Sequence, residues 1–409
     1  NSIKTLPKNK LHIVAFDVPY PADYGGVIDI YYKCKELNKL GVSIALHIYQ
    51  YGRKKNDEKL KEVCDHLYYY KRHTFKNPFI GSKPYIVATR NGEELLENLR
   101  KDNAPILFEG LHCTYHIDAV SLKNRFKIVR THNIEHHYYK HLERSELSYF
   151  KKYFFRIEAE KLRKYESKLK HASLIAAISP NDTAYFSKKY DNVIYLPAFH
   201  SNEDLKYSGK KGKYLLYHGN LSVPENYMAA IELVNNIFNE LNSPVIIAGN
   251  NPPKQLIDLC EKYEHIQLST DLQTKDLNEL IKNAHINVLY TNQNTGIKLK
   301  LLNALYRGKF SVVNPLMVKG SGLEEYCLVG EDFKVMLQHI RNYLLLDFTK
   351  AYAEKRASYL SYNFGNSNGA QLLIDQIDFT GVDKPVRQSD KGILKRLSQL
   401  SSVMSYFSL

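Results

Sequence analysis

The order of strands and helices near the start of the chain constrains the fold most strongly. A strand, LHIVAF (11–16), is followed by a glycine-bearing loop (17–26), a helical span from 27 to 41 and a second strand, SIALHIY (43–49). Such a crossover predicts a parallel pair of strands. Four more short apolar runs follow: HLYYY (66–70), PILFEG (105–110), FKIVRTH (126–132) and SLIAAIS (173–179). Because helical spans alternate with them, we expect an open α/β sheet covered on both faces.

The same pattern then starts again after a polar, lysine-rich connector (201–213). The strands expected beyond it are YLLYHGN (214–220), SPVIIAGN (243–250), IQLST (266–270), INVLY (286–290) and FSVVN (310–314). The fold class is therefore predicted as α/β, with two Rossmann-like, doubly wound domains facing a central cleft. The predicted parts are a first domain (1–200), a second domain (201–362), a helical span (363–380) and a basic amphipathic tail (381–409).

Length and composition agree with two soluble domains. A chain of 409 residues is too long for one ordinary core, and 44% apolar with 24% charged residues is typical of a globular protein. No apolar run approaches the roughly 20 residues that span a bilayer, and the first residues contain no apolar signal core. The five cysteines are scattered without a CxxC pair, which predicts reduced thiols in a cytoplasmic protein.

The net charge of +14 is the unusual total. It favours anionic partners, namely phosphorylated small molecules, an acidic membrane face or nucleic acid. The sequence contains no RNP-like signature, zinc-finger spacing or recognisable helix-turn-helix, so we expect no nucleic-acid partner.

Ligands of open α/β sheets bind beyond the carboxyl ends of the strands and between domains, so we looked for candidate residues in loops that follow strands. Glycines there let backbone N–H groups approach a phosphate, and a helix N-terminus adds partial positive charge. Three loops fit this pattern: Gly25 with Gly26, Gly219 with Asn220, and Gly249. Each can also be interpreted as a plain turn.

The stretch NTGIKLKLLNALYRGK (294–309) is a fourth candidate. Its helix is predicted to begin between Ile297 and Leu299, just after Gly296, which places Lys298 and Lys300 near the first turn. Cations there are disfavoured by the helix dipole, by roughly 0.3–1 kcal/mol each. That cost indicates a compensating anion; the alternative is a pair of solvated lysines.

Two strand ends carry groups suited to catalysis. Glu109 and His112 follow one strand and His132 ends the next, so an acid and imidazoles are expected at the edge of the cleft. Each histidine can equally be structural. His136 and His137, on the following helix, are expected to face solvent. No HExxH or similar ligand spacing occurs, so we predict no metal.

Six segments, taken in order, resemble GT-B glycosyltransferases, specifically the retaining enzymes of glycosyltransferase family four. They are PYPADYGGVIDIYYKCKEL (19–37), HNIEHHYY (132–139), AAISPNDTAYF (176–186), YHGNLSVPEN (217–226), VIIAGNNP (245–252) and NTGIKLKLLNALYRGK (294–309). The resemblance implies transfer of a sugar from a nucleotide-sugar, UDP- or GDP-linked, with retained configuration, no cofactor and no metal. The acceptor implied is a glycan or a lipid-linked molecule of cell-surface polysaccharide or glycolipid synthesis.

The resemblance also implies that the helix at 363–380 crosses back to the first domain, and it implies roles for single residues. Gly25 and Gly26 would approach the donor diphosphate, His112 would lie beside the transferred sugar, and the Gly219 loop with Lys300 and Lys298 would hold the phosphates. Family members usually carry two glutamates separated by seven residues, and the matching positions here are Thr295 and Asn303. The second glutamate normally contacts the ribose, so Asn303 would hydrogen-bond a ribose hydroxyl as a neutral group. The missing glutamates leave open a non-catalytic protein that binds sugar-nucleotides or glycans. A sugar-nucleotide epimerase of the same fold is the other alternative.

Two basic segments suggest contact with an anionic membrane surface. The region 136–171 contains ten Lys/Arg and five Glu with aromatics among the cations, and the tail 391–407 repeats apolar residues at helical intervals beside Lys391, Lys395 and Arg396. The alternatives are a solvated helix face and a tail docked on the first domain. The location expected is cytoplasmic, peripheral on the inner face of the cell membrane.

Overall fold

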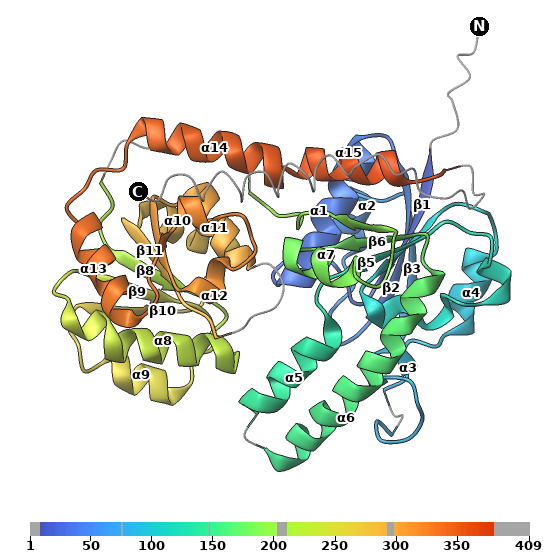
Figure 1. Ribbon diagram of the computed structural model, residues 1–409, viewed down its shortest axis with the longest axis horizontal. Coiled ribbons are helices and arrows are strands. Elements are labelled where there is room, and N and C mark those ends of the chain that lie inside the picture. The colour runs from blue at the N-terminus through green and yellow to red at the C-terminus, as the bar shows by residue number, and fades with distance from the viewer. Residues whose placement is uncertain (1–8, 75–76, 147, 203–210, 293–297, 380–409) are drawn as a thin grey trace, which may run out of the picture.

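The protein contains two parallel α/β sheets side by side, each covered by helices, with two long helices running across both (Figure 1). The structure is a computed structural model that describes residues 9–74, 77–146, 148–202, 211–292 and 298–379.

The first sheet has seven parallel strands in the order β3-β2-β1-β4-β5-β6-β7. Its strands are β1 (Lys10–Ala15), β2 (Ser43–Gln50), β3 (His66–Lys71), β4 (Ile106–Glu109), β5 (Lys127–Thr131), β6 (Leu174–Ala177) and β7 (Val193–Tyr195). The central strands β4, β5 and β6 are buried along their whole length, as expected for strands covered on both faces.

Helices cover both faces of this sheet. They are α1 (Gly25–Lys39), α2 (Asp57–Lys61), α3 (Tyr85–Ala88), α4 (Glu93–Leu99), α5 (Glu135–Ser145), α6 (Tyr149–Tyr165) and α7 (Pro180–Phe186), with 3-10 turns η1 (Leu111–His116), η2 (Val120–Leu122) and η3 (Glu166–His171). Helices α1 and α2 share one core, and α3 to α7 contribute to the core on the other face. Helix α7 begins where Ser179 accepts a hydrogen bond from the Asp182 amide, with Pro180 in the first turn.

The second sheet has six parallel strands in the order β10-β9-β8-β11-β12-β13. They are β8 (Leu215–His218), β9 (Val245–Ala248), β10 (Ile266–Ser269), β11 (Ile286–Leu289), β12 (Phe310–Val313) and β13 (Leu328–Val329). Its helices are α8 (Pro224–Asn236), α9 (Lys254–Cys260), α10 (Thr274–Asn283), α11 (Leu299–Arg307), α12 (Pro315–Val318) and α13 (Phe333–Tyr343), with η4 (Phe238–Glu240) and η5 (Glu324–Tyr326). Helices α8, α9 and α13 pack on one face, and α10, α11 and α12 on the other.

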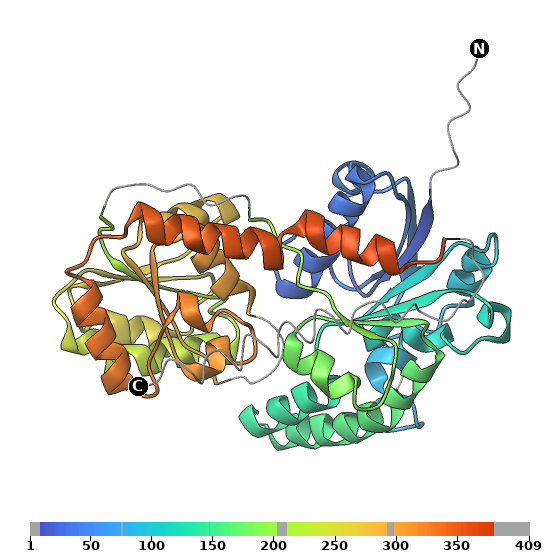
Figure 2. The ribbon, with the colours of Figure 1, turned by 45° about the horizontal axis from the view of Figure 1, so that its top comes forward.

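Helices α14 (Lys350–Phe364) and α15 (Asn366–Gln376) connect the two halves, end to end (Figure 2). Leu360 and Phe364 of α14 are buried with α11 and α12, whereas Ala370 and Leu373 of α15 are buried with α1 in the core of the first sheet. The chain therefore returns to the first half after completing the second.

The predicted pair of doubly wound parallel sheets is confirmed, and every strand proposed from the sequence is present. Two short edge strands, β7 and β13, were not predicted. Helix α1 starts at Gly25 rather than two residues later, so both glycines belong to its first turn. The prediction that His136 faces solvent is wrong: it is 5% exposed, with Nδ1 3.2 Å from Glu166.

Some predictions concern residues outside the described ranges. The residues concerned are Thr295, Gly296, most of the connector 201–213 and the tail 381–409. Among the described helices, none has the length and apolarity needed to cross a membrane.

Candidate active site

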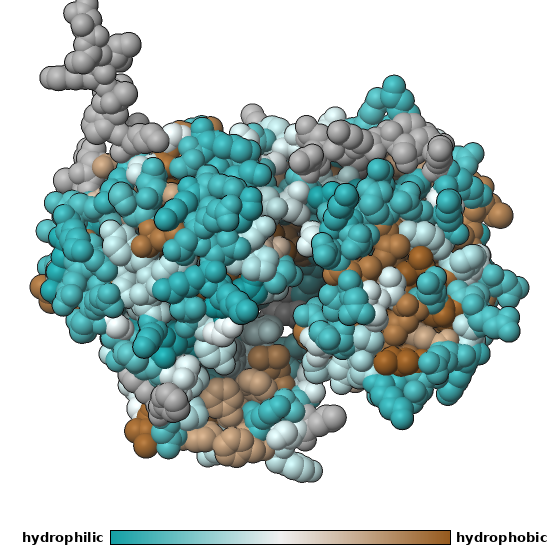
Figure 3. Space-filling model, turned by 180° about the vertical axis from the view of Figure 1, so that it is seen from behind, coloured by the Kyte–Doolittle hydropathy of each residue, from teal (hydrophilic) through white to brown (hydrophobic). Residues whose placement is uncertain are grey.

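Each sheet has a point where the strand order reverses, between β1 and β4 in the first and between β8 and β11 in the second. Ligands of doubly wound sheets bind beyond the carboxyl ends of the strands at such points. The loops that leave these four strands carry the residues singled out in the sequence: Gly25 and Gly26, His112, Gly219, and Lys298 with Lys300. A hollow separates the two halves on one face of the molecule (Figure 3).

The N-termini of α1 and α11 meet across this cleft. A Cβ atom on Gly26 would stand 2.5 Å from the Phe16 ring, so only glycine lets that ring pack under the helix start. Gly25 is exposed, and a Cβ there would lie 3.8 Å from Cδ1 of Leu299 in α11. Neither helix has an acidic residue in its first turn. Two positive helix ends thus face the same space without a carboxylate of their own.

Glu109 belongs to a buried network of charges behind the cleft. Lys33 Nζ lies 2.7 Å from Asp29 and 2.9 Å from Glu109, and Arg130 makes two hydrogen bonds to Asp29, of 2.9 and 3.1 Å. The second oxygen of Glu109 lies 3.0 Å from Nε2 of His132. Glu109 itself is fully buried, contrary to the expectation of an acid at the edge of the cleft. Its carboxylate therefore orients His132.

Three members of this network, Asp29, Glu109 and His132, place ligand atoms within 4.8 Å of one another. A cluster of this kind can hold a metal ion in other proteins. Here Lys33 and Arg130 already neutralise the carboxylate oxygens that a metal would need. The donor set therefore does not fit a metal ion.

His112 follows Gly110, whose φ of 73° is in the region that favours glycine. The His112 ring packs 5.3 Å from that of Phe16, measured between centroids, and 22% of the side chain is exposed. Burial lowers the pKa of His112 well below its usual value, and Arg90 and His132 lower it further. The imidazole is therefore neutral near pH 7 and can exchange hydrogen bonds with a hydroxyl group.

Glu135, the first residue of α5, lies next to His112. Its Oε1 is 4.0 Å from Nδ1 of His112, and neither atom has a hydrogen-bond partner among the described residues. Burial raises the pKa of Glu135 to about 8, with a further contribution from Asp182. Near neutral pH this carboxyl group therefore keeps its proton.

Lys298 and Lys300 occupy the start of α11, as predicted, but both are only partly exposed. Lys298 is the N-cap, and Nζ of Lys300 donates to Oδ1 of Asn226 at 3.2 Å and to the carbonyl of Tyr290 at 3.4 Å. Burial lowers the pKa of each lysine to about 8, and Glu225 opposes the shift in both. The site thus holds two desolvated cations at a helix N-terminus.

The glycine loops of the second half pack against each other. A Cβ on Gly249 would overlap the carbonyl oxygen of Gly219, so the two loops touch through backbone alone. The side-chain oxygen of Asn220 accepts hydrogen bonds from the backbone amide and the hydroxyl group of Ser222. The main-chain carbonyl of Asn220 accepts one from the side-chain amide of Asn226. The same Asn226 side chain accepts the hydrogen bond from Lys300, so it connects this turn to the lysine.

No protein-family model matches the chain. A curated relative from Klebsiella pneumoniae, described as an uncharacterized 44.6 kDa protein in the cps region, is 27% identical over 356 residues, which is 82% of this chain and 90% of that protein.

Solved structures match over nearly the whole chain. A mutant of S. aureus TarM, in complex with fondaparinux, alpha-GlcNAc-glycerol and UDP, has a TM-score of 0.64 at 10% identity, covering 90% of this chain and 99% of that one. Anabaena Alr3699/HepE, in complex with UDP and glucose, has a TM-score of 0.55 at 12% identity, covering 95% and 99%. A glycosyltransferase from Rickettsia africae has a TM-score of 0.58 at 14% identity, covering 90% and 97%.

The chain has the GT-B fold. At such low identity these matches establish the arrangement of the GT-B sheets and leave the reaction open. The predicted fold class is confirmed, whereas the residue roles still depend on the geometry described above.

One residue expected in the cleft of this GT-B protein is engaged elsewhere. Asn303 accepts a hydrogen bond of 2.9 Å from Asn202, which follows the last strand of the first half, and Asn202 in turn accepts one of 2.7 Å from Arg307. The Asn303 oxygen is thus occupied at the connection between the GT-B halves, where it was expected to meet a ribose hydroxyl.

Sequence reasoning missed several residues of the GT-B cleft. Phe16 supports both Gly26 and the histidines, and Glu135 places an acid beside His112. Asp182 is a second acid, and its charge opposes the lowering of the Lys298 pKa. The signal for Glu135 and Asp182 was present, because each stands in the first turn of a helix that directly follows a strand of the first sheet. Glu225, in the first turn of α8, has the same position in the second sheet.

Proposed function

We propose that the protein is a retaining glycosyltransferase that moves a sugar from a nucleotide-sugar to a glycan or lipid-linked acceptor. The observation that carries the proposal is the meeting of two helix N-termini, at Gly25 and Leu299, beside the desolvated amines of Lys298 and Lys300. A diphosphate is a ligand that suits amide groups, helix dipoles and ammonium groups together.

The donor diphosphate would lie between α1 and α11. Gly25 exposes the backbone amides of α1, while Lys300 approaches from the other side of the cleft. As the bond to the sugar breaks, negative charge accumulates on the departing diphosphate, and fixed cations and amides in a desolvated site stabilise it without reorganisation. In this proposal the two lysines supply the charge that a divalent ion supplies in other transferases, so the reaction needs no metal and no cofactor.

The transferred sugar would lie against His112. A neutral imidazole at a partly exposed edge of the site suits a sugar hydroxyl, which both donates and accepts hydrogen bonds. Glu109 acts behind the cleft by orienting His132 on the acceptor side. Gly219, Asn220 and Gly249 form the turn that would face the nucleotide.

Two comparisons support this choice of substrates. The TarM and HepE structures were determined with UDP, and HepE also with glucose. The Klebsiella relative is encoded in a cps (capsule) region, which agrees with a role in cell-surface polysaccharide synthesis. We place the protein on the cytoplasmic side of the cell membrane, where nucleotide-sugars are made, as a peripheral protein.

A second candidate function is binding of a sugar-nucleotide or glycan without turnover. It is favoured by the absence of carboxylates at positions 295 and 303, and by the engagement of Asn303 with Asn202. A sugar-nucleotide epimerase of the same fold is a third candidate.

A donor screen distinguishes these functions. Thermal shift against UDP-, GDP-, ADP- and CMP-sugars should identify one donor, because a ligand in excess stabilises the folded form. Release of free nucleotide only in the presence of acceptor supports transfer. An isomerised donor without acceptor supports the epimerase, and saturable binding without turnover supports the binding protein. The absence of binding to every donor would contradict all three.

A further inference from the structure

The outer end of the α5–α6 hairpin exposes large apolar side chains next to one another. Ile80, Tyr149, Phe150 and Tyr153 are 75%, 91%, 69% and 58% exposed. The ring of Phe79 joins the loop to the helix, with its centroid 5.7 Å from that of Phe150 and 5.9 Å from that of Tyr153. Brown side chains gather on the lower projecting part of the molecule, where the hairpin lies (Figure 3). A contiguous apolar surface of this kind marks an interaction site.

The same surface is strongly basic. Lys151, Lys152, Arg156 and Lys164 alternate with the aromatics of α6 and are exposed. The acids of this helix do not offset them, because Glu158 is fully buried and accepts a hydrogen bond from the Tyr85 amide. Glu160 is already paired with Arg163 at 3.0 Å. We call these exposed apolar and cationic side chains, with Phe79 and Ile80, the α6 patch.

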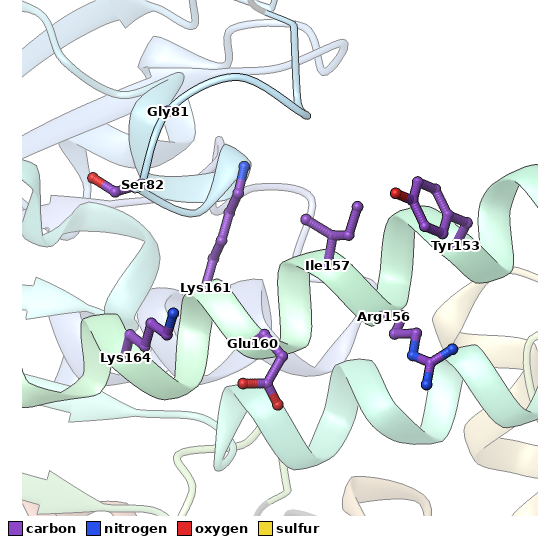
Figure 4. A pocket seen from close by; sticks show the side chains of 8 residues that line it. All are labelled: Gly81, Ser82, Tyr153, Arg156, Ile157, Glu160, Lys161 and Lys164. Carbon is purple, nitrogen blue, oxygen red and sulfur yellow. The ribbon is translucent and has the colours of Figure 1, made fainter.

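A hollow of about 570 Å³ adjoins the patch. Its lining combines apolar and cationic side chains with a hydroxyl group and one carboxylate, Glu160, which is paired with Arg163. The other lining residues are Gly81, Ser82, Tyr153, Arg156, Ile157, Lys161 and Lys164. Lys161 reaches from α6 towards the loop that carries Ser82 (Figure 4), and its amine donates to the carbonyl of Pro78 at 2.6 Å. Cations, a hydroxyl and apolar walls together suit a phosphate group attached to a glycerol or an acyl chain.

We propose that the α6 patch docks the protein on an anionic phospholipid bilayer. The aromatic side chains and Ile80 enter the headgroup boundary, the cations contact lipid phosphates, and the hollow receives one headgroup. Charge complementarity selects this partner: a helix with interleaved aromatic and basic side chains is suited to the interface of an anionic membrane. An acidic protein or a nucleic acid would account for the cations and leave the exposed Ile80 and Phe150 without a role.

This inference rests on the proposed function only for its purpose, which is to bring the cleft to a lipid-linked acceptor. Helix α5 of the same hairpin begins at the candidate site, since Oε1 of its first residue, Glu135, lies 4.0 Å from Nδ1 of His112. Vesicle binding and donor binding are separate measurements, so either proposal can fail without the other.

Co-sedimentation with vesicles tests the docking surface on the full chain. We expect binding to phosphatidylcholine vesicles that contain phosphatidylglycerol, little binding to phosphatidylcholine alone, and weaker binding at higher ionic strength. The double variant Tyr149→Ser, Phe150→Ser should bind at least about tenfold more weakly, since it removes the apolar insertion. Arg156→Ala and Lys164→Ala should each cost about fivefold. All four side chains are exposed, so thermal unfolding should not change.

Matched controls lie on α14, on the opposite side of the molecule (Figure 1). Tyr362 is 75% exposed and the Lys350 side chain 71% exposed, so Tyr362→Ser and Lys350→Ala remove the same chemistry elsewhere. Both should bind vesicles as the wild type does. Three results would overturn the proposal: no binding of the wild type to anionic vesicles, equal binding to neutral ones, or unchanged binding by the Tyr149, Phe150 double variant. The last would assign any binding to another part of the chain.

Discussion

Lys300 brings a positive charge into an interior where its hydrogen-bond partners are neutral, the side chain of Asn226 and the carbonyl of Tyr290. Burial lowers the pKa of this amine, which means that the folded protein bears an unfavourable free energy for keeping it charged. An anionic ligand in the cleft would remove that cost. The lysine is therefore better explained by a phosphate-binding site than by stability.

Lys300→Gln should weaken the binding of UDP by about 10- to 100-fold, the usual range for a lost charge-assisted hydrogen bond. In the wild type, affinity should also fall as the pH rises through about 8, because the amine that binds the diphosphate loses its proton there. Isothermal titration of UDP measures both effects. The exposed Lys350→Ala variant is the control, and equal affinities of Lys300→Gln and wild type would contradict the assigned role.

The pKa of Glu135 is raised, whereas that of Lys300 is lowered, and this gives a prediction about the pH dependence of stability. The pKa of Glu135 is raised from 4.5 to about 8, so the folded protein keeps a proton that the unfolded chain releases. This contribution is fully present below about pH 4.5 and is lost as the pH rises to about 8. Glu135→Gln carries no such titration. Its stability relative to wild type should therefore increase by about 3–4 kcal/mol between about pH 5 and pH 8, measured by urea unfolding. The same difference at both pH values would contradict a buried, protonated Glu135.

At the scale of elements, the sequence predicted best what depends on local pattern. Strands such as β11 are short apolar runs buried on both faces, so periodicity and length suffice to find them. The edge strand β7 is only half-buried and β13 has two residues, so neither gives a clear apolar run. The positions of Lys298 and Lys300 were also predictable, because a helix start is a local feature. The burial of Glu109 was not, since it depends on Lys33 from a helix over seventy residues earlier.

The close contact between the Gly219 loop and the Gly249 loop predicts that a side chain at Gly249 is not tolerated. Gly249→Ala would drive a Cβ atom into the carbonyl of Gly219 and crowd Leu221, so the loop that faces the nucleotide must move. We expect a loss of about 1–3 kcal/mol in stability and weaker UDP binding, read by urea unfolding and titration. Gly92→Ala is the control, because a Cβ there meets no atom within 4 Å. A Gly249→Ala protein as stable as wild type would contradict the close contact.

At the scale of the whole molecule, the return of the chain through α14 and α15 links the two halves. Leu373 of α15 is fully buried in the same core as α1. Helix α15, the last described helix, therefore belongs to the hydrophobic core of the first half, and its packing against α1 joins it to that core.

Leu373→Ala should lower the free energy of unfolding by about 2–5 kcal/mol, as large-to-small changes in a core do. Asp375→Ala on the same helix changes an exposed residue and should alter it by less than about 0.5 kcal/mol. Urea unfolding followed by circular dichroism provides both values. Equal stabilities of the two variants would mean that α15 does not stabilise the first half.

The proposed function depends most on a cleft between the two halves that holds a diphosphate with amide and ammonium groups. A crystal structure of the protein with UDP or GDP, grown without divalent ions, tests it most directly. We expect the diphosphate between the first turns of α1 and α11, within hydrogen-bond distance of Lys300. A nucleotide bound elsewhere, or a cleft left empty at saturating nucleotide, would contradict it.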